Sequence, residues 1–362
     1  MNVLLTGGAG YIGAHLLVDL LEEGHDVVVF DNCSTGSAEA IARAECLTGR
    51  QCTFVHADVR DAESVRGALK GIDAVIHLAG SKKVGESVAF PARYFHNNVG
   101  GMAVLIDEME RAGIHKIVYS SSAAVYGTQH QVPIAEDAPL RPDSPYGRSK
   151  LLGEHMLADL AACGTWSAVS LRYFNPVGAH PSGLIGEPLS EAASLVPRAL
   201  RALLDSDDQL AIFGTDYATR DGTCLRDYVH VCDLARAHLD ALSILERPGH
   251  HVYNVGTGNG CSVREVLASC ERVAGRPVPA LDGERRAGDV AVAVADVSKI
   301  ADELGFRATR GLDDMVTSAW RWACRHPDGY TNLTPVLRLQ ARAAAPTSVS
   351  VDALEERTCR TG

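Results

Sequence analysis

The chain of 362 residues is 46% hydrophobic and 22% charged, which is enough apolar material for a large core in one or two domains. Its 45 acidic and 34 basic residues give a formal net charge of −11, which argues against non-specific binding to nucleic acid or to an anionic membrane. The longest apolar runs fall far short of the ~20 residues that cross a bilayer. A strand is predicted from residue 3, so there is no room for a signal peptide and we expect a cytoplasmic protein.

Short apolar runs alternate with helical patterns through the first half of the chain. Strands are predicted over residues 3–6, 26–30, 52–55, 74–78, 116–120 and 167–172, and helices over 12–21, 62–69 and 99–112. This alternation predicts an α/β fold with a Rossmann-like, doubly wound parallel sheet covered on both faces. Because the crossovers between parallel strands are right-handed, we expect the ligand at the edge formed by the carboxyl ends of the strands.

The pattern becomes irregular after Asn175. Residues 176–188 are rich in Gly and Pro and predict a loop into a smaller C-terminal α/β lobe. Strands over 229–231 and 251–255 are expected to return to the large sheet, and helices are predicted over 262–274, 298–304 and 312–325. We therefore expect a first domain of residues 1–175 and 227–255 and a lobe of residues 176–226 and 256–330. Residues 331–362 contain no aromatic residue and are predicted to form a mobile tail.

A glycine-rich turn joins the first predicted strand to the first predicted helix. It reads Thr6-Gly-Gly-Ala-Gly-Tyr-Ile-Gly13 and suits the pyrophosphate of a dinucleotide on a helix N-terminus. Asp31, at the end of the next strand, could hold the adenosine ribose hydroxyls and would repel a 2′-phosphate, which favours NAD over NADP. The alternative for Asp31 is an acid that caps a turn.

Later strand ends add candidate contacts to the same ligand. Asp58-Val59 follows the third strand and Leu78-Ala79-Gly80 follows the fourth. Asn97 either contacts the cofactor or caps the helix that is predicted to begin near Val99.

Tyr146 and Lys150 are separated by one helical turn and would share one face of a helix. At about 4 Å and an effective dielectric near 20, a cation stabilises a phenolate by roughly 4 kcal/mol. That is about 3 pKa units, enough to bring a tyrosine toward neutrality. Tyr146 then fits as the general base for an alcohol, and Ser122, at the end of the fifth strand, could hydrogen-bond the same oxygen. The alternative is an ordinary exposed helix.

These motifs resemble the extended short-chain dehydrogenases/reductases, and within them the UDP-galactose (UDP-glucose) 4-epimerases. The resemblance runs from Met1 to about Tyr330 and is most specific in the strings 172–183 and 221–230. It implies an isomerase that interconverts UDP-glucose and UDP-galactose by transient oxidation at C4 of the hexose. NAD stays bound in the first domain, and the smaller lobe binds the nucleotide sugar. Relatives dimerise through helices equivalent to residues 99–112 and 146–160, so a homodimer is expected.

The resemblance also implies roles for individual residues. Catalysis falls to Tyr146, Lys150 and Ser122. The residues expected to contact NAD are Gly7, Gly10, Tyr11, Ile12, Gly13, Asp31, Asn32, Asp58, Val59, Leu78, Ala79, Gly80, Lys82, Asn97, Ser122, Tyr146, Lys150, Tyr173 and Phe174. The residues expected to contact the UDP-sugar are Lys82, Ser122, Tyr146, Asn175, Ser194, Arg226, Arg286, Asp289 and Ala293. The two arginines suit a diphosphate or ribose as charge-assisted donors. Without the surrounding motifs they would be interpreted as surface ion pairs.

Two departures from the family pattern bear on the sugar. Ser194 lies in a segment, Glu191 to Leu195, where the familiar pattern is Pro-Asn-Asn-Leu. Ala293 stands where some relatives carry a tyrosine that walls the sugar pocket. The smaller side chain leaves room for a 2-N-acetyl group, so we also expect UDP-GlcNAc and UDP-GalNAc to be interconverted.

Three other functions share parts of this pattern. Another UDP-sugar 4-epimerase, such as a UDP-glucuronate 4-epimerase, stays open. A 4,6-dehydratase lacks its proton donor, because Ser122 is followed by Ala123-Ala124. A non-catalytic NAD-binding sensor is disfavoured because both Tyr146 and Lys150 are present. No metal is expected, since the ten cysteines form no CxxC pair and the fourteen histidines no HExxH motif.

Overall fold

The computed structural model describes residues 1–330 except 130, 191–192, 206–207 and 287–288. The predicted tail over 331–362 therefore lies outside the described residues, as do Glu191 and Ala192 of the segment that differs from the family pattern. None of the described helices combines the length and the apolar composition that a membrane span requires.

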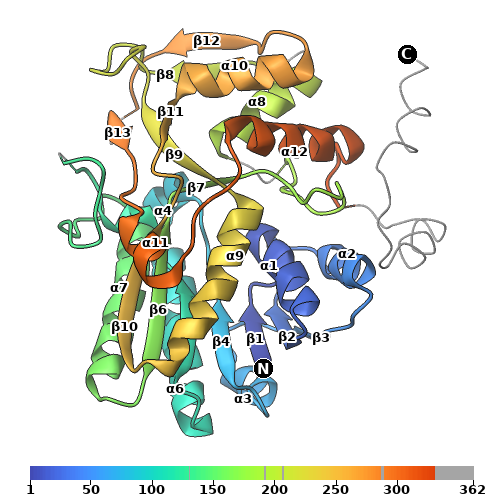
Figure 1. Ribbon diagram of the computed structural model, residues 1–362, viewed down its shortest axis with the longest axis vertical. Helices are drawn as coiled ribbons and strands as arrows, with labels where there is room; N and C mark the ends of the chain where they lie inside the picture. The colour runs from blue at the N-terminus through green and yellow to red at the C-terminus, as the bar shows by residue number, and fades with distance from the viewer. Residues whose placement is uncertain (130, 191–192, 206–207, 287–288, 331–362) are drawn as a thin grey trace.

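A seven-stranded parallel sheet forms the larger part of the molecule (Figure 1). Its order is β10-β6-β5-β4-β1-β2-β3, and all neighbouring pairs are parallel. The strands are β1 (Asn2–Thr6), β2 (Asp26–Asp31), β3 (Thr53–His56), β4 (Ala74–His77), β5 (Lys116–Ser120), β6 (Ser167–Tyr173) and β10 (Gly249–Val255). The predicted Rossmann-like sheet is confirmed. Because β1 lies between β4 and β2, the order of the strands reverses beside β1, which is where such sheets bind ligands.

Both faces of this sheet are buried, as the side chains of β1 illustrate. Val3 and Leu5 pack with α1 (Tyr11–Glu22), α2 (Ala38–Thr48) and α9 (Val231–Ala241). Leu4 points to the opposite face, against helices on that side. Those helices are α3 (Ala62–Ala68), α6 (Gly101–Ala112) and α7 (Pro145–Ala162). Successive apolar residues in a strand thus need helices on both sides, which explains the continuous apolar runs of the sequence.

The helix predicted over 99–112 begins earlier than expected. Helix α5 (Pro91–Tyr94) continues through a π-helical turn (Phe95–Gly100) into α6. Asn97 lies inside that turn, so the alternative in which it caps a helix starting near Val99 is wrong. π-Helical turns are rare and occur often at functional sites.

The smaller lobe is built on a four-stranded sheet and a two-stranded one. In the former, β9 (Leu225–His230) lies between β11 (Gly260–Ser262) and β13 (Val292–Ala293) and also pairs with β7 (Asn175–Val177). The prediction that the strand over 229–231 returns to the large sheet is therefore wrong, whereas the strand over 251–255 does return, as β10. β9 lies in the smaller sheet because it pairs with β7, which follows β6 directly in the chain.

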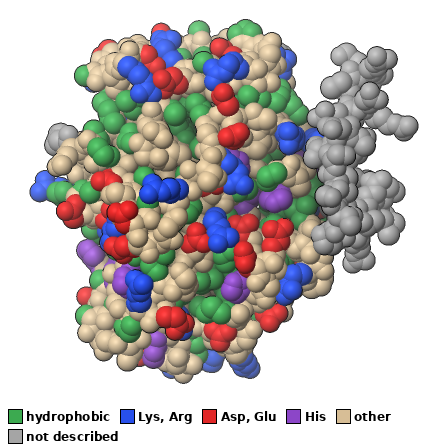
Figure 2. All heavy atoms as spheres, viewed as in Figure 1, with side chains coloured by type: hydrophobic (Ala, Val, Ile, Leu, Met, Phe, Trp, Pro, Cys, Tyr) green, Lys and Arg blue, Asp and Glu red, His purple; other side chains and the backbone are tan. Residues whose placement is uncertain are grey.

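The remaining elements cover these sheets. The two-stranded sheet contains β8 (Leu210–Phe213) and β12 (Ala280–Gly283). Helices α8 (Leu195–Leu204), α10 (Val263–Ala274) and α12 (Leu312–Arg325) enclose the core of the smaller lobe. The predicted helices over 262–274, 298–304 (α11, Ser298–Leu304) and 312–325 are confirmed. On the face seen in Figure 2, acidic and basic side chains of the described residues are interspersed.

Candidate active site

A cleft of about 600 Å³ opens at the carboxyl edge of the large sheet, beside β1. It brings together residues that were predicted from separate motifs. The predicted residues that line it are Gly7, Gly10, Tyr11, Ile12, Gly13, Asp31, Asn32, Val59, Leu78, Ala79, Gly80, Lys82, Asn97, Tyr146, Lys150 and Tyr173. The glycine-rich turn and the Tyr146/Lys150 pair thus face one cleft.

The packing of the glycine-rich turn leaves no room for a side chain at Gly7 or at Gly13. Gly7 has φ +73°, and a Cβ there would lie 2.6 Å from the backbone nitrogen of Ala79. A Cβ at Gly13 would lie 2.2 Å from the carbonyl oxygen of Gly7. α1 begins after Gly10, no side chain caps its first turn, and that turn carries no acidic residue. Its free N–H groups and positive helix end fit the pyrophosphate of a dinucleotide.

Asp31 borders the cleft and also fastens the turn. Its carboxylate accepts hydrogen bonds from the backbone N–H groups of Ala9 (3.0 Å) and Cys33 (2.7 Å). Burial raises the pKa of Asp31, and these two bonds oppose that rise. A carboxylate with two oxygens keeps further lone pairs for ribose hydroxyls.

Asp58 does not line the cleft, although a cofactor contact was predicted for it. Its carboxylate pairs with Arg60 (2.6 Å) and accepts a hydrogen bond from Asn32 Nδ2 (2.9 Å). The Arg60 contact holds the pKa of Asp58 well below its usual range. In this structure Asp58 therefore acts on the cleft through Asn32, which does line it.

The start of α7 places Tyr146 against the end of β5. Ser144 caps the helix by accepting a hydrogen bond from the Gly147 N–H (3.1 Å), and the Tyr146 N–H donates to Ser87 Oγ (3.2 Å). A Cβ at Gly147 would lie 2.5 Å from the carbonyl oxygen of Ala124, so the helix packs directly on the turn that follows Ser122. This close approach places the Ser122 hydroxyl beside the phenol of Tyr146.

The electrostatics of the pair differ from the prediction. Burial raises the pKa of Tyr146, and the neighbouring Ser122 hydroxyl opposes the rise. Burial lowers the pKa of Lys150 to about 8, against the field of Glu154, and its ammonium donates to the Ser120 carbonyl (2.7 Å). The predicted lowering of the Tyr146 pKa by Lys150 is therefore wrong for this structure, because loss of hydration costs the phenolate more than its neighbours return.

Residues from the smaller lobe complete the cleft, and no local pattern predicted them. Glu187, Pro188, Ser190 and Tyr330 line it. Lys82 Nζ lies 2.9 Å from Glu187 Oε1 and 5.7 Å from the centre of the Tyr11 ring. This ion pair spans the cleft between segments far apart in the chain, so no spacing rule could have found it.

The predicted substrate residues of the smaller lobe form a separate cluster. The Asp289 carboxylate pairs with Arg226 (3.7 Å) and with Arg286 (3.4 Å), whose guanidinium lies 4.4 Å from the centre of the Phe213 ring. Ala293 pairs with Arg226 across β13 and β9. The structure thus brings these four together, although none is among the residues that line the 600 Å³ cleft.

Three other predicted residues have structural neighbours of their own. Phe174 is buried in a cluster with Val125, Tyr126, Ile134 and Ala295, away from the cleft lining. Asn175 begins β7, and Ser194 precedes α8 without a capping bond from its side chain. Among the described residues, no group of three or more His, Cys, Asp or Glu side chains is arranged to hold a metal ion.

Comparisons with known proteins agree with this geometry. Residues 3–256 match the NAD dependent epimerase/dehydratase family. The UDP-glucose 4-epimerase of Bacillus subtilis is 49% identical over 335 residues, which cover 91% of this chain and 99% of that protein.

Solved structures show the same likeness. One is the UDP-glucose-4-epimerase of Stenotrophomonas maltophila with bound NAD and formylated UDP-arabinopyranose, with a TM-score of 0.88, 44% identity and coverage of 91% and 99% of the two chains. Another is the UDP-glucose 4-epimerase of Bifidobacterium longum in complex with NAD+ and UDP, with a TM-score of 0.87, 42% identity and coverage of 91% and 100%. The resemblance inferred from the motifs is confirmed, and the chain belongs to the NAD dependent epimerase/dehydratase family.

Proposed function

We propose that this protein is a UDP-glucose 4-epimerase, which interconverts UDP-glucose and UDP-galactose with NAD held in the cleft. One observation carries the proposal: Tyr146, with the Ser122 hydroxyl beside it, faces the same cleft as the glycine-rich turn. The named relatives and the NAD-bound neighbours support it. Residues 1–175 and 227–255 are proposed to form the NAD-binding domain, apart from residues 227–230 of β9, which lie in the sheet of the smaller lobe. Residues 176–226 and 256–330 are proposed to bind the nucleotide sugar. A cytoplasmic location remains a prediction from the sequence.

Each residue of the site then has a task. NAD, when bound, supplies the redox partner for C4 of the hexose. The first-turn N–H groups of α1 bind its pyrophosphate and Asp31 its ribose. Tyr146 takes the proton from the sugar hydroxyl and returns it, while Ser122 holds that hydroxyl in line. Protonated Lys150, one helical turn beyond Tyr146 on the same face, is proposed to stabilise the phenolate during the reaction.

The smaller lobe would hold the nucleotide while the hexose stays loosely bound. Arg226 and Arg286 are proposed to bind the diphosphate or ribose, with Asp289 keeping both guanidinium groups near one another until substrate arrives. A loose hexose is required because each face of C4 must meet the cofactor in turn.

The test is product analysis with the purified protein. Incubation with UDP-galactose should yield UDP-glucose, and Tyr146→Phe should lower the rate on the order of 100-fold or more, since general acid–base catalysis contributes that much. Conversion that proceeds undiminished in the variant would refute the role of Tyr146. Separate incubations with UDP-galacturonate and UDP-GalNAc identify the preferred sugar. Absence of any conversion, with NAD still bound, would favour the sensor alternative.

A second activity is proposed from Ala293. It lies opposite Arg226 in the sheet of the smaller lobe, and alanine leaves open the volume that a tyrosine would fill. We propose that UDP-GlcNAc and UDP-GalNAc are also interconverted. Ala293→Tyr should abolish the N-acetylated activity and keep the UDP-galactose activity, whereas equal loss of both would contradict the proposal.

A homodimer through the α6 and α7 side of the molecule is also proposed. Helices α4 (Val84–Ala89) and α7 pack against each other on this side. Large apolar side chains are exposed on α7, on α4 and on the residue after α4: Leu152 (41% exposed), Val88 (64%) and Phe90 (54%). Leu152→Glu should convert a dimer to a monomer in light scattering coupled to size-exclusion chromatography. A wild-type protein that elutes as a monomer at micromolar concentration would refute the dimer.

A further inference from the structure

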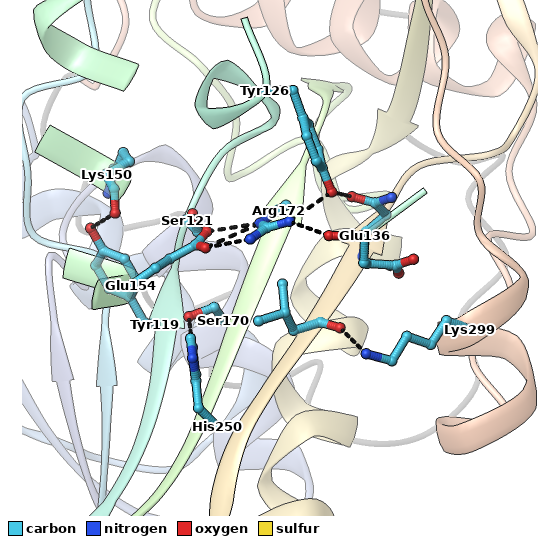
Figure 3. A network of polar contacts seen from close by, with 12 residues as sticks. Tyr119, Ser121, Tyr126, Glu136, Lys150, Glu154, Ser170, Arg172, His250 and Lys299 are labelled. Atoms are coloured by element: carbon cyan, nitrogen blue, oxygen red, sulfur yellow. Dashed lines mark hydrogen bonds and ion pairs between the residues drawn. The ribbon is translucent and has the colours of Figure 1, made fainter. Parts of the chain in front are cut away.

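A buried ion pair lies directly behind the catalytic residues. The Arg172 Nε lies 3.0 and 3.2 Å from the two oxygens of Glu154, and its second guanidinium nitrogen lies 2.6 Å from Glu154 Oε2. The side chains are only 4% and 3% exposed. The Ser121 hydroxyl also donates a hydrogen bond to Glu154 Oε1 (Figure 3).

The partners of this pair are all parts of the active-site wall. Glu154 lies one turn beyond Lys150 on α7, and Lys150 lies one turn beyond Tyr146, so the three side chains share one face of the helix. Ser121 immediately precedes Ser122, whose hydroxyl lies beside the phenol of Tyr146. The Glu154 carboxylate therefore joins the helix that carries Tyr146 to the strand end that carries Ser122.

Arg172 extends the same connection to the loop after Ser122. Its other terminal nitrogen donates to the Tyr126 hydroxyl (3.0 Å) and to the Glu136 carbonyl oxygen (2.9 Å). The Tyr126 hydroxyl in turn donates to Asn254 Oδ1 on β10 (2.7 Å). Figure 3 shows Arg172 at the centre of these contacts, between Glu154 and Tyr126. Each polar group of the guanidinium is thus used to fix a segment beside the site.

A buried pair of this kind is poorly explained by fold stability. Two charges taken out of water lose their hydration, and a well-packed apolar pair of similar volume is often as stable or more stable. What apolar side chains cannot supply is a directional bond to Ser121 and a negative charge beside Lys150.

We propose that Glu154, held by Arg172, is a positioning residue that fixes Tyr146 against Ser122 and keeps Lys150 charged. This inference rests on the proposed function, because it assigns Glu154 to the same site. Glu154 touches the reacting atoms only through Ser121 and through the helix face that it shares with Tyr146.

The other titratable groups around Lys150 and Glu154 do not replace this charge. Those near Lys150 are His77 on β4, Tyr119 on β5 and His238 on α9; those near Glu154 are Tyr119, Tyr126, Arg172 and His250 on β10. Burial lowers the pKa of His77 to about 3 and that of His238 and His250 to about 4, so all three are neutral near pH 7. Glu154 is the neighbour whose charge raises the pKa of Lys150.

The test removes both charges together, so that neither is left buried alone. The variant Glu154→Leu/Arg172→Met is prepared as the NAD-loaded protein, and its melting temperature and NAD content are expected to match the wild type. Its kcat should fall at least tenfold, and on the order of 100-fold if Tyr146 moves by about 1 Å, with little change in KM. A matched control is Glu108→Leu/Arg66→Met, a bidentate pair with both contacts at 2.7 Å that joins α3 to α6, which should keep the wild-type kcat.

A second readout follows the Lys150 ammonium itself. The ¹⁵N resonance of its Nζ, assigned by its absence from the Lys150→Arg counterpart of each protein, is titrated to give the pKa of Lys150. That pKa should fall in the double variant by about one unit, because the negative charge of Glu154, which favours the ammonium, is removed. This arm needs no sugar, so it decides the role of Glu154 even if the wild type fails to epimerise UDP-galactose, which would refute the proposed function alone.

Ser121→Ala provides a variant that keeps the ion pair. It should lower kcat about threefold to tenfold at an unchanged melting temperature, since one hydrogen bond is lost. If the double variant does not fold, Ser121→Ala decides the matter. A wild-type kcat in Ser121→Ala, or a double variant with both wild-type kcat and an unmoved Lys150 titration, would overturn the proposal.

Discussion

Replacement of Gly13 by alanine should weaken cofactor binding although alanine is the better helix former. Gly13 lies in the first turn of α1, where Gly→Ala ordinarily stabilises a helix by about 1 kcal/mol. Here the new Cβ would lie 2.2 Å from the Gly7 carbonyl oxygen and 2.6 Å from the Gly8 Cα, whereas ordinary contacts begin at 3.4 Å. Both neighbours are backbone atoms, so the turn must move by about 1 Å, at a cost of roughly 1–3 kcal/mol.

That movement separates the first-turn N–H groups from the pyrophosphate. Loss of one charge-assisted hydrogen bond costs about 1.5–3 kcal/mol, or roughly a tenfold to hundredfold rise in the Kd for NAD. The Kd is measured by fluorescence titration and the free energy of unfolding by urea denaturation. Gly67→Ala is the matched control: Gly67 lies in α3 with no atom within 4 Å of the added Cβ, so stability should rise by about 0.5–1 kcal/mol with an unchanged Kd. Wild-type affinity for NAD in Gly13→Ala would refute the reasoning.

Three further outcomes are expected. Because the pKa of Lys150 is lowered to about 8, its ammonium is present below that pH and is lost as the pH rises, so kcat should fall above about pH 8. Lys150→Arg should remove this fall from the pH–rate profile, whereas an identical fall in the variant would contradict the assignment. Asp31→Asn should reduce the preference for NAD over NADP at least tenfold, measured as a ratio of Kd values, since the negative charge that repels a 2′-phosphate is removed; an unchanged ratio would assign the preference to other groups. Arg43→Met should lower the free energy of unfolding by about 3 kcal/mol in urea denaturation, because Arg43 is 1% exposed, bonds to Glu39 (3.3 Å) and lies 5.1 Å from the centre of the Tyr330 ring. A change below about 1 kcal/mol would show that these contacts add little.

The amino-acid sequence alone determined the parts of this protein that follow from local pattern. Apolar runs in β1 and its parallel neighbours predict a sheet covered on both faces, since every side chain in such a run must be buried. The glycines from Gly7 to Gly13 predict a close turn before a helix, and the spacing of Tyr146 and Lys150 predicts one shared helix face. Each of these inferences needs only a strand or helix period and a few neighbouring residues.

Contacts between distant segments were decided only by the tertiary structure. β9 pairs with β7 in the smaller lobe and not with a strand of the large sheet, and Glu187 pairs with Lys82 although the two lie 105 positions apart. The pKa of Tyr146 rises because its surroundings are buried, which no spacing in the sequence reports. Glu154 and Arg172 meet because α7 packs against β6, and the energy of that contact depends on hydration lost and bonds gained in three dimensions.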